Sequence, residues 1–227
     1  ARASGQGTTR RADQRTGKTI AVHGVRGGVG ATTTVVNTGW LLANIHNRHV
    51  VLADFDLSGG TLALELGMES SSGLAELLTG PDRIDNVFVD RALLEVEERL
   101  KLLASEAAFE TNQDYDAAAV AALMQHLRNR FHFIIQDVDR GRPAVAMEVL
   151  QAADVRLLVM DPSLAAVRDA ARILKLLEKG AEAQKTLVIL NRVRPGGRAD
   201  VPLDKITEFI DHPVDLVIPF DRKKLAL

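Results

Sequence analysis

The residues best suited to chemistry form a glycine-rich loop near the N-terminus. The glycines of Gly27–Gly30 follow a short apolar segment and precede the hydroxyl run Thr32–Thr34. Glycines let successive backbone N–H groups turn inward around an anion, and a following helix adds its dipole. The segment therefore predicts a phosphate-binding P-loop. It departs from the standard pattern G-x-x-x-x-G-K-[ST] because Val25 replaces the first glycine and Ala31 replaces the lysine.

Carboxylates follow two apolar segments farther along the chain. Asp54 and Asp56 come at the end of the segment that begins at His49, and Asp137 ends the segment that begins at Phe131. Ligands of open α/β sheets sit beyond the carboxyl ends of the strands, and an Asp in that place can orient Mg²⁺ directly or through water. The alternative is that such an Asp only caps the next turn. The glycine loop upstream favours the magnesium site.

Strands and helices must alternate along the chain to position these residues. Apolar strands are predicted at Thr19–Val25, His49–Asp54, Leu100–Leu103, Phe131–Asp137, Val155–Met160, Lys185–Leu190 and Val214–Val217. Helical spacing predicts helices at about Thr32–Asn47, Ser72–Leu78, Asp116–Asn129, Pro143–Ala152, Leu164–Lys179 (capped by Ser163 and ended by Gly180) and Leu203–Asp211. This alternation predicts a three-layer α/β/α fold with a mainly parallel central sheet. The acidic stretch Glu95–Glu98 is expected to be a solvated face or turn.

The composition limits the function classes. The chain has 227 residues, 46% of them hydrophobic, and a formal net charge of −2. No global field therefore favours nucleic acid. The absence of cysteine excludes disulfides, thiolate catalysis, Cys-ligated zinc and iron–sulfur clusters. No apolar run approaches the length of a membrane span, so a soluble cytoplasmic protein is expected.

The first 18 residues are expected to be a flexible basic tail or linker. They carry five basic side chains against Asp13 and have no apolar face. A basic contact arm is the alternative to a solvated linker. Residues 19–227 are expected to form one P-loop ATPase-like domain, because no interior linker or repeat interrupts the alternation.

The motifs and their order resemble the ParA/MinD family of deviant Walker A ATPases, and within it the CpaE/TadZ branch of Tad (Flp) pilus assembly proteins. The family's K-G-G-x-G-K-[ST]-T corresponds to Arg26–Thr33, with Arg26 at the signature lysine and Ala31 at the P-loop lysine. An arginine and an alanine at these places are typical of the CpaE-like branch. The similarity covers residues 19–221 through Val51–Asp56, Gly73–Leu78, the Asp137 strand, Ala153–Arg168, Leu187–Val193 and Ile218–Asp221.

The resemblance implies a site for ATP or ADP with Mg²⁺. It assigns nucleotide contacts to Arg26, Gly27, Gly28, Val29, Gly30, Ala31, Thr32, Thr33, Asn191, Arg192, Pro219 and Asp221. Within that set, Asn191 would bind the adenine amino edge, and Pro219 and Asp221 would line the base. The metal would be held by Thr32, Asp54 and Asp137, directly or through water. The catalytic residues would be Asp56, which orients water, Asp137, and Arg26, which would reach a partner's nucleotide across a dimer interface.

Two departures from the family weaken the catalytic part. Ala31 removes the P-loop cation, and Asp139 stands where the family has the proline of D-x-P. Losing one positioned electrostatic contact costs on the order of 10²–10³ in rate, so hydrolysis is expected to be weak or absent. Arg26 could compensate in a dimer, whereas Arg140 and Arg142 read more readily as surface arginines than as surrogates.

The function expected from the resemblance is localisation and assembly of Tad type IV pili. The protein would bind ATP, form a homodimer, and contact pilus secretion and assembly proteins. It would act in the cytoplasm, at the cell pole or peripheral to the inner membrane through an indirect association. The alternative is an active ParA-like partitioning ATPase that binds DNA non-specifically, which Ala31 and the net charge disfavour. An electron-donating reductase of the nitrogenase type would need cluster-ligating cysteines.

Overall fold

The sheet that carries the glycine loop is continuous and almost entirely parallel. The computed structural model describes residues 16–57, 59–69, 72–105, 116–138, 140–178, 184–194 and 201–221. Its strands lie in the order β3-β4-β2-β5-β1-β6-β7-β8. Only β3 runs antiparallel to its neighbour in this part of the chain. Their bounds are β1 Lys18–Gly24, β2 Val50–Asp54, β3 Leu94–Glu97, β4 Leu100–Leu103, β5 Phe133–Asp137, β6 Val155–Met160, β7 Lys185–Val193 and β8 Leu216–Pro219.

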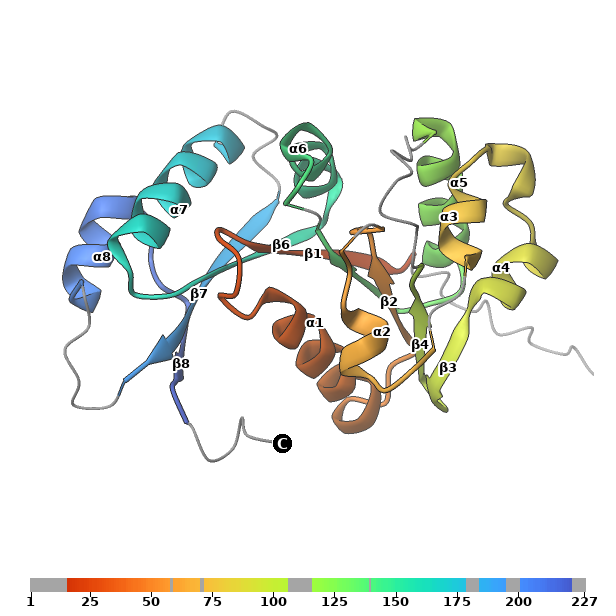
Figure 1. The fold of residues 1–227 in the computed structure, drawn as a ribbon, viewed down its shortest axis with the longest axis horizontal. Helices are drawn as coiled ribbons and strands as arrows, with labels where there is room; N and C mark the ends of the chain where they lie inside the picture. Colours follow the sequence, from red (N-terminus) through yellow and green to blue (C-terminus); the bar gives the residue numbers. More distant parts are fainter. Residues whose placement is uncertain are drawn as a thin grey trace, which may run out of the picture.

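Helices cover both faces of this sheet, which confirms the predicted three-layer α/β/α fold (Figure 1). Helices α1 and α2 lie on one face, and α3 to α8 lie on the other. The helical bounds are α1 Ala31–Trp40, α2 Leu62–Glu65, α3 Gly73–Leu77, α4 Asn86–Ala92, α5 Ala117–Arg128, α6 Pro143–Ala152, α7 Leu164–Leu177 and α8 Leu203–Ile210. A π-helix at Leu41–Ile45 extends α1, and a 3₁₀ turn spans Pro81–Arg83.

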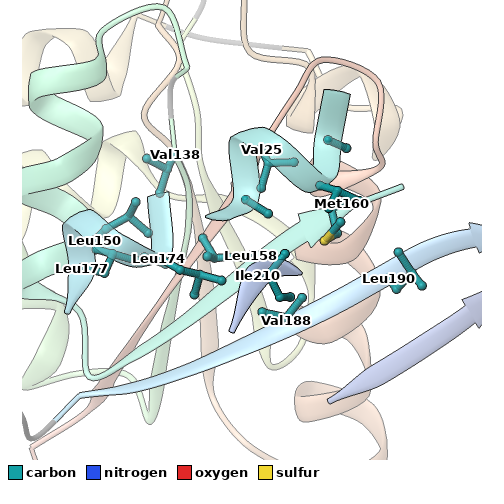
Figure 2. Packing of buried hydrophobic residues seen from close by; sticks show 14 of the residues in the cluster. Val25, Val138, Leu150, Leu158, Met160, Leu174, Leu177, Val188, Leu190 and Ile210 are labelled. Atoms are coloured by element: carbon teal, nitrogen blue, oxygen red, sulfur yellow. The ribbon is translucent and has the colours of Figure 1, made fainter. Parts of the chain in front are cut away.

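Alternate strand residues feed separate cores on the two faces, as the period of two in a strand requires. One of these cores lies beneath α6, α7 and α8, where strand side chains pack against helical ones (Figure 2). Its strand residues include Leu158, Met160, Val188 and Leu190, and its helical residues include Leu150, Leu174, Leu177 and Ile210. The central strands are therefore rigidly packed, and their carboxyl ends form a fixed platform for the loops that follow.

The stretch Glu95–Glu98 has the predicted solvated face, since its three glutamates are exposed, but its first three residues lie in a strand and not in a turn. Leu94 and Val96 are half-buried and alternate with exposed Glu95 and Glu97, which makes β3 a short edge strand against β4. The salt bridge between Lys101 Nζ and Glu95 Oε2, 2.6 Å long, joins the two strands on the solvent side. Charged side chains facing out are common on edge strands, because they discourage further pairing.

Other differences concern the ends of elements and some short helices. The predicted helix Thr32–Asn47 is regular only to Trp40, and α2, α4 and the 3₁₀ turn were not predicted. The strand predicted at Val214–Val217 lies two residues later and includes Pro219, which an edge strand tolerates. The predicted tail overlaps β1 at Lys18. Residues 1–15 of that tail, Asp139 and Gly180 lie outside the described residues.

Candidate functional site

The glycine loop between β1 and α1 adopts a conformation that requires glycine. Gly28 has a φ of 74° and Gly30 a φ of 96°, both in the left-handed region that other residues rarely adopt. Gly30 is also the N-cap of α1, where its carbonyl accepts from the backbone N–H of Thr34 at 3.0 Å and from its hydroxyl at 2.7 Å. The loop thus turns tightly and leaves the N–H groups of the first helical turn available to an anion.

A cavity of about 730 Å³ lies at this loop, beyond the carboxyl ends of β1, β2 and β5. It brings together most of the predicted site residues, namely Arg26, Gly27, Gly28, Val29, Gly30, Ala31, Thr32, Thr33, Asp56, Asp137 and Arg192. The segment after β2 and the segment after β5 complete its lining, with Gly59, Gly60, Thr61, Glu65, Arg140 and Arg142 among them. Four chain segments far apart in sequence, the fourth being the end of β7 with Arg192, therefore meet at one site.

Asp137 is the carboxylate at the end of β5 that was predicted to bind a metal ion. It is 8% exposed and lines the cavity together with Thr32. Burial, helped by the nearby carboxylates of Asp56 and Glu65, raises the pKa of Asp137 to about 6 against the lowering effect of Thr32. Such a carboxyl is ready to exchange its proton for a cation.

Asp54 lies beneath the cavity rather than among the residues that line it. It pairs in register with Asp137 on the neighbouring strand. Its Oδ1 accepts from the backbone N–H of Asp56 at 3.2 Å and its Oδ2 from that of Leu62 at 3.1 Å. Burial, followed by repulsion from Asp137, raises the pKa of Asp54 to about 7. Its direct contacts thus position the loop after β2.

The oxygen donors at this point fit Mg²⁺. The Thr32 hydroxyl and the Asp137 carboxylate line the cavity and are hard oxygen ligands of the kind that Mg²⁺ prefers, whereas Asp54, predicted as a third ligand, lies on the neighbouring strand and does not line it. In the described part of the chain, no group of three or more His, Cys, Asp and Glu side chains is placed to hold a metal ion. A Mg²⁺ ion here would therefore need ligands from phosphate and water as well, which is its usual mode of binding beside nucleotides.

Asp56 faces the cavity from the segment after β2. Its Oδ1 accepts from the backbone N–H of Gly59 at 2.8 Å, and its carbonyl accepts from that of Gly60 at 2.7 Å. These bonds fold the segment into a tight turn beside Asp54. A side-chain Cβ at Gly60 would lie only 2.3 Å from Asp54 Oδ2. The turn therefore depends on glycine at position 60, which the motif analysis did not single out.

The residues predicted to contact a base lie at the ends of β7 and β8. Asn191 Nδ2 donates to the carbonyl of Val29 at 2.8 Å, so it fastens the glycine loop to β7. Arg192 reaches the cavity and has a φ of 62°, whereas Asn191, Pro219 and Asp221 do not line it. The predicted nucleotide contacts therefore fall into two sets. The glycine loop and Arg192 line the cavity, whereas Asn191, Pro219 and Asp221 lie outside it at the ends of β7 and β8.

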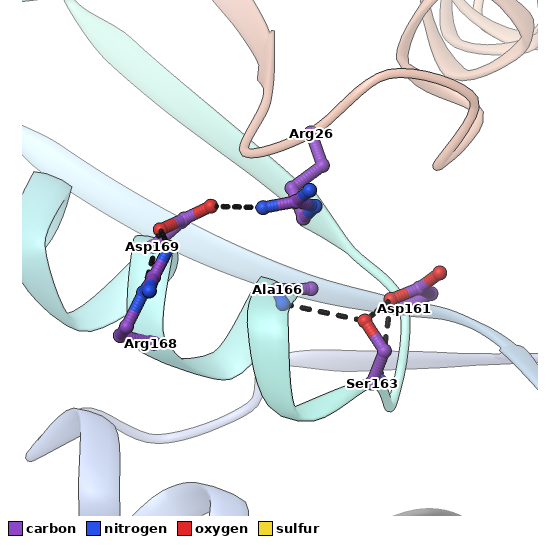
Figure 3. A network of polar contacts seen from close by, with 6 residues as sticks. All are labelled: Arg26, Asp161, Ser163, Ala166, Arg168 and Asp169. Carbon is purple, nitrogen blue, oxygen red and sulfur yellow. Dashed lines mark hydrogen bonds and ion pairs between the residues drawn. The ribbon is translucent and has the colours of Figure 1, made fainter.

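Arg26 lies at the rim of the cavity, but its guanidinium is turned toward α7 (Figure 3). Arg26 Nη1 and Asp169 Oδ2 are 2.6 Å apart. Asp169 also accepts from Arg168 at 3.0 Å, and α7 itself is capped by Ser163, which accepts from the N–H of Ala166. Partial burial would raise the pKa of Asp169, but the bonds from Arg26 and Arg168 outweigh it and lower that pKa. Nothing in the sequence spacing indicated this partner for Arg26.

Arg140 was the other residue that sequence reasoning undervalued. Its guanidinium lies against the glycine loop, because a Cβ built on Gly27 would be 2.9 Å from Arg140 Nη2. The residue that replaces the family's proline, Asp139, lies outside the described residues.

No helix among the described residues is long and apolar enough to cross a membrane.

Known proteins share this fold and this stretch of sequence. The sequence profile of a family described as "AAA domain" matches residues 17–189. The septum site-determining protein MinD of Synechocystis is 31% identical over 209 residues, 90% of this chain and 76% of that protein. A ParA family ATPase from Chlorobium tepidum superposes with a TM-score of 0.80 at 26% identity, over 92% of this chain and 86% of that one. MinD of Pyrococcus horikoshii, solved in complex with Mg-ADP, superposes with a TM-score of 0.68 at 23% identity, over 90% and 82%.

Proposed function

The chain belongs to the ParA/MinD family of ATPases, and from that membership we propose that it binds ATP with Mg²⁺ at Gly27–Thr33 and then forms a homodimer. The observation that carries this proposal is that the glycine loop, Thr32 and buried Asp137 line one cavity beyond the carboxyl ends of the strands. A glycine loop alone could hold any small anion. A hydroxyl beside a carboxylate at that place also suits the Mg²⁺ that accompanies a nucleotide.

The phosphate end of the site would be held mainly by the backbone. The N–H groups of Gly27–Gly30 and the N-terminus of α1 would surround the phosphates, and Thr32 and Asp137 would hold Mg²⁺. Mg²⁺, when bound, neutralises charge on the phosphate oxygens. Asp54 would orient Asp137 and the turn after β2 from below, and Asp56 would orient water at the cavity.

The base end would use the outer strands. Asn191, Arg192, Pro219 and Asp221 come from the ends of β7 and β8, next to each other in the sheet. The amide nitrogen of Asn191 has two hydrogens, of which one is given to the carbonyl of Val29. The second could donate to a base without releasing the loop. The same residue would then connect base binding to the shape of the phosphate loop.

Turnover at this site would be slow. Ala31 provides no charge at the position of the P-loop lysine, and the loss of one such contact costs on the order of 10²–10³ in rate. The backbone cradle, the helix dipole and Mg²⁺ do not depend on that lysine, so binding can persist where hydrolysis is feeble. The catalytic roles of Asp56, Asp137 and Arg26 are therefore proposed for a weak ATPase that serves mainly as a switch.

At the cellular level we propose a role of the CpaE/TadZ type. The support is the pattern Arg26–Thr32, in which an arginine and an alanine replace the two family lysines, as in proteins that localise and assemble Tad pili. The dimer would contact pilus secretion and assembly proteins in the cytoplasm, at a pole or at the periphery of the inner membrane. The competing function is partitioning by non-specific DNA binding.

Nucleotide binding and dimerisation are tested together by sedimentation velocity at increasing ATP with Mg²⁺ in excess over the nucleotide. Wild type should shift from monomer to dimer with ATP, and Thr32→Ala should not, because it loses the hydroxyl that faces Asp137. Thr79→Ala, which removes an exposed hydroxyl far from the loop, is the matched control. Absence of both binding and a dimer for wild type contradicts the switch.

The cellular role is tested by what the ATP-bound protein captures. Pilus secretion components from the same cell should co-purify with wild type and be lost with Thr32→Ala. Binding to random duplex DNA that weakens steeply with salt would favour the partitioning function instead.

A further inference from the structure

The cavity lacks a lysine on its loop but is lined by four arginines. These are Arg26, Arg140, Arg142 and Arg192, and they come from the loop, the segment after β5, and the end of β7. We propose that Arg140 supplies the phosphate-binding cation that Ala31 lacks. This inference rests on the proposed nucleotide site and identifies the residue that gives it positive charge.

The position of Arg140 is the main argument. A Cβ built on Gly27 would lie 2.9 Å from Arg140 Nη2, 3.4 Å from Cζ and 3.6 Å from Nη1. The guanidinium therefore lies beside the loop at Gly27, in space that a side chain at this position would occupy. A phosphate held by the loop would lie within reach of a group so placed, and a guanidinium can give it two parallel hydrogen bonds.

Within the described part of the chain, Arg140 is exposed and forms no ion pair with a carboxylate. Arg26 differs in this respect because its Nη1 is 2.6 Å from Asp169 Oδ2 on α7. Arg142 lies at the N-cap of α6 and also lines a second cavity between α5 and α6. Arg192 is on the β7 side, near the proposed base end.

Arg140 lies on a different chain segment from the one that carries a P-loop lysine. A P-loop lysine comes from the N-terminus of the helix after the loop, whereas Arg140 comes three residues after Asp137. The same short segment would therefore hold the Mg²⁺ carboxylate and the phosphate cation.

The test is a double-mutant cycle on nucleotide affinity. Mant-ADP and mant-ATP with Mg²⁺ are titrated into wild type, Arg140→Ala, Arg140→Lys, Ala31→Lys and the double variant Ala31→Lys/Arg140→Ala. Hydrogen bonds to charged groups contribute about 1.5–3 kcal/mol, so Arg140→Ala should weaken binding about 10- to 150-fold. Arg140→Lys should weaken it less, because it keeps the charge and loses the planar fork.

Rescue distinguishes a substitute cation from a merely nearby one. Ala31→Lys should recover most of the affinity in the Arg140→Ala background and add much less to wild type, since a single cation suffices. Arg99→Ala, in the turn between β3 and β4, is the matched control and should bind as wild type. Thermal unfolding of each variant checks that the substitution leaves the fold intact.

Three other results would contradict the proposal, each at a different point. If wild type binds and Arg140→Ala binds equally well, Arg140 is not the cation. If Arg140→Ala is weak but Ala31→Lys adds the same factor in both backgrounds, the two positions act independently and the replacement is refuted. If neither wild type nor Ala31→Lys binds nucleotide, the proposed function fails and this inference fails with it.

Discussion

Arg26 on the glycine loop is joined to Asp169 on α7 by an ion pair of 2.6 Å (Figure 3). The two residues are 143 positions apart, so the pair links the N-terminal loop to the outer face of the sheet. Arg26 is 45% exposed and Asp169 is 18% exposed at their side chains. A role for Arg26 across a dimer interface requires this pair to open. The monomer therefore holds its signature arginine on its own α7.

Asp169→Asn should make the dimer easier to form. Exposed ion pairs contribute about 0.2–1 kcal/mol, so a dimer that must break this pair should tighten by up to about five-fold when the pair is already weakened. Sedimentation velocity with saturating ATP and Mg²⁺ measures the change. Glu178→Gln, at the exposed end of the same helix, is the control and should leave the dimer unchanged. A weaker dimer for Asp169→Asn would show that Asp169 supports the interface instead.

Gly60→Ala should destabilise the turn after β2. The added Cβ would lie 2.3 Å from Asp54 Oδ2 and 2.5 Å from the carbonyl oxygen of Asp56, and one of these atoms belongs to the backbone. Overpacking of this kind costs about 1–3 kcal/mol, which urea unfolding can measure. Gly80→Ala is the matched control, because nothing lies within 4 Å of its Cβ position. Equal effects of the two substitutions would contradict the tight approach of Gly60 to Asp54.

Asp54 should make the metal-free protein less stable as pH rises. Burial and the nearby Asp137 raise its pKa to about 7, above the ordinary value of 3.8. Between about pH 4 and pH 7, the folded chain therefore still holds a proton that the unfolded chain has already released. Its contribution to the free energy of unfolding is fully present below about pH 4 and is lost as pH rises through 7.

The check is urea unfolding in EDTA at pH 5 and pH 7.5. Asp54→Asn should reduce the loss of stability between these two values by about 1–3 kcal/mol. Asp204→Asn, on the exposed side of α8, should not change it. An unchanged pH slope in Asp54→Asn would show that Asp54 does not titrate in this range.

Asp154 should have the opposite pH dependence at the other end of the sheet. It accepts from the backbone N–H and hydroxyl of Thr19 at 2.9 Å each, and pairs with Lys18 and Arg128. Burial alone would raise its pKa, but these bonds outweigh burial and lower the pKa to about 2. The folded value lies below the unfolded value, so its stabilisation is present above about pH 4 and is lost as pH falls through 2.

Asp154→Asn should therefore lower stability at pH 7 by about 1 kcal/mol, after allowance for solvent screening, and the difference should shrink in acid. Urea unfolding at pH 7 and pH 3 measures both values. Asp90→Asn, which breaks a more exposed pair with Arg130, serves as the control and should change stability less. A difference that stays constant with pH would contradict the linkage to Asp154.

The loop and the strand-end carboxylates could be predicted because they depend on local sequence. Gly28 and Gly30 require left-handed φ values, and Asp137 follows an apolar strand that the period of two places in the sheet. Strand–helix alternation was enough for the parallel sheet. β3 was missed because its four residues alternate in burial only against β4, a partner that no local pattern reveals.

The contacts of the arginines could not be predicted in the same way. Asp169 meets Arg26 only because α7 crosses the sheet beside the glycine loop, and Arg140 meets Gly27 only because β5 lies next to β1. Both contacts depend on strand order and on side-chain direction. The sequence predicted that Arg140 lies on the surface, and the residue is exposed. The sequence could not show that this part of the surface lies beside the glycine loop.

A crystal structure of the protein with ATP and Mg²⁺ tests the central claim most directly. The account predicts phosphate density within Gly27–Thr32, a Mg²⁺ ion at Thr32 and Asp137, and the Arg140 guanidinium on a phosphate oxygen. It also predicts that Arg26 leaves Asp169 where two protomers meet. An empty glycine loop at saturating nucleotide, with Arg140 still lying against Gly27 and no dimer, would contradict it.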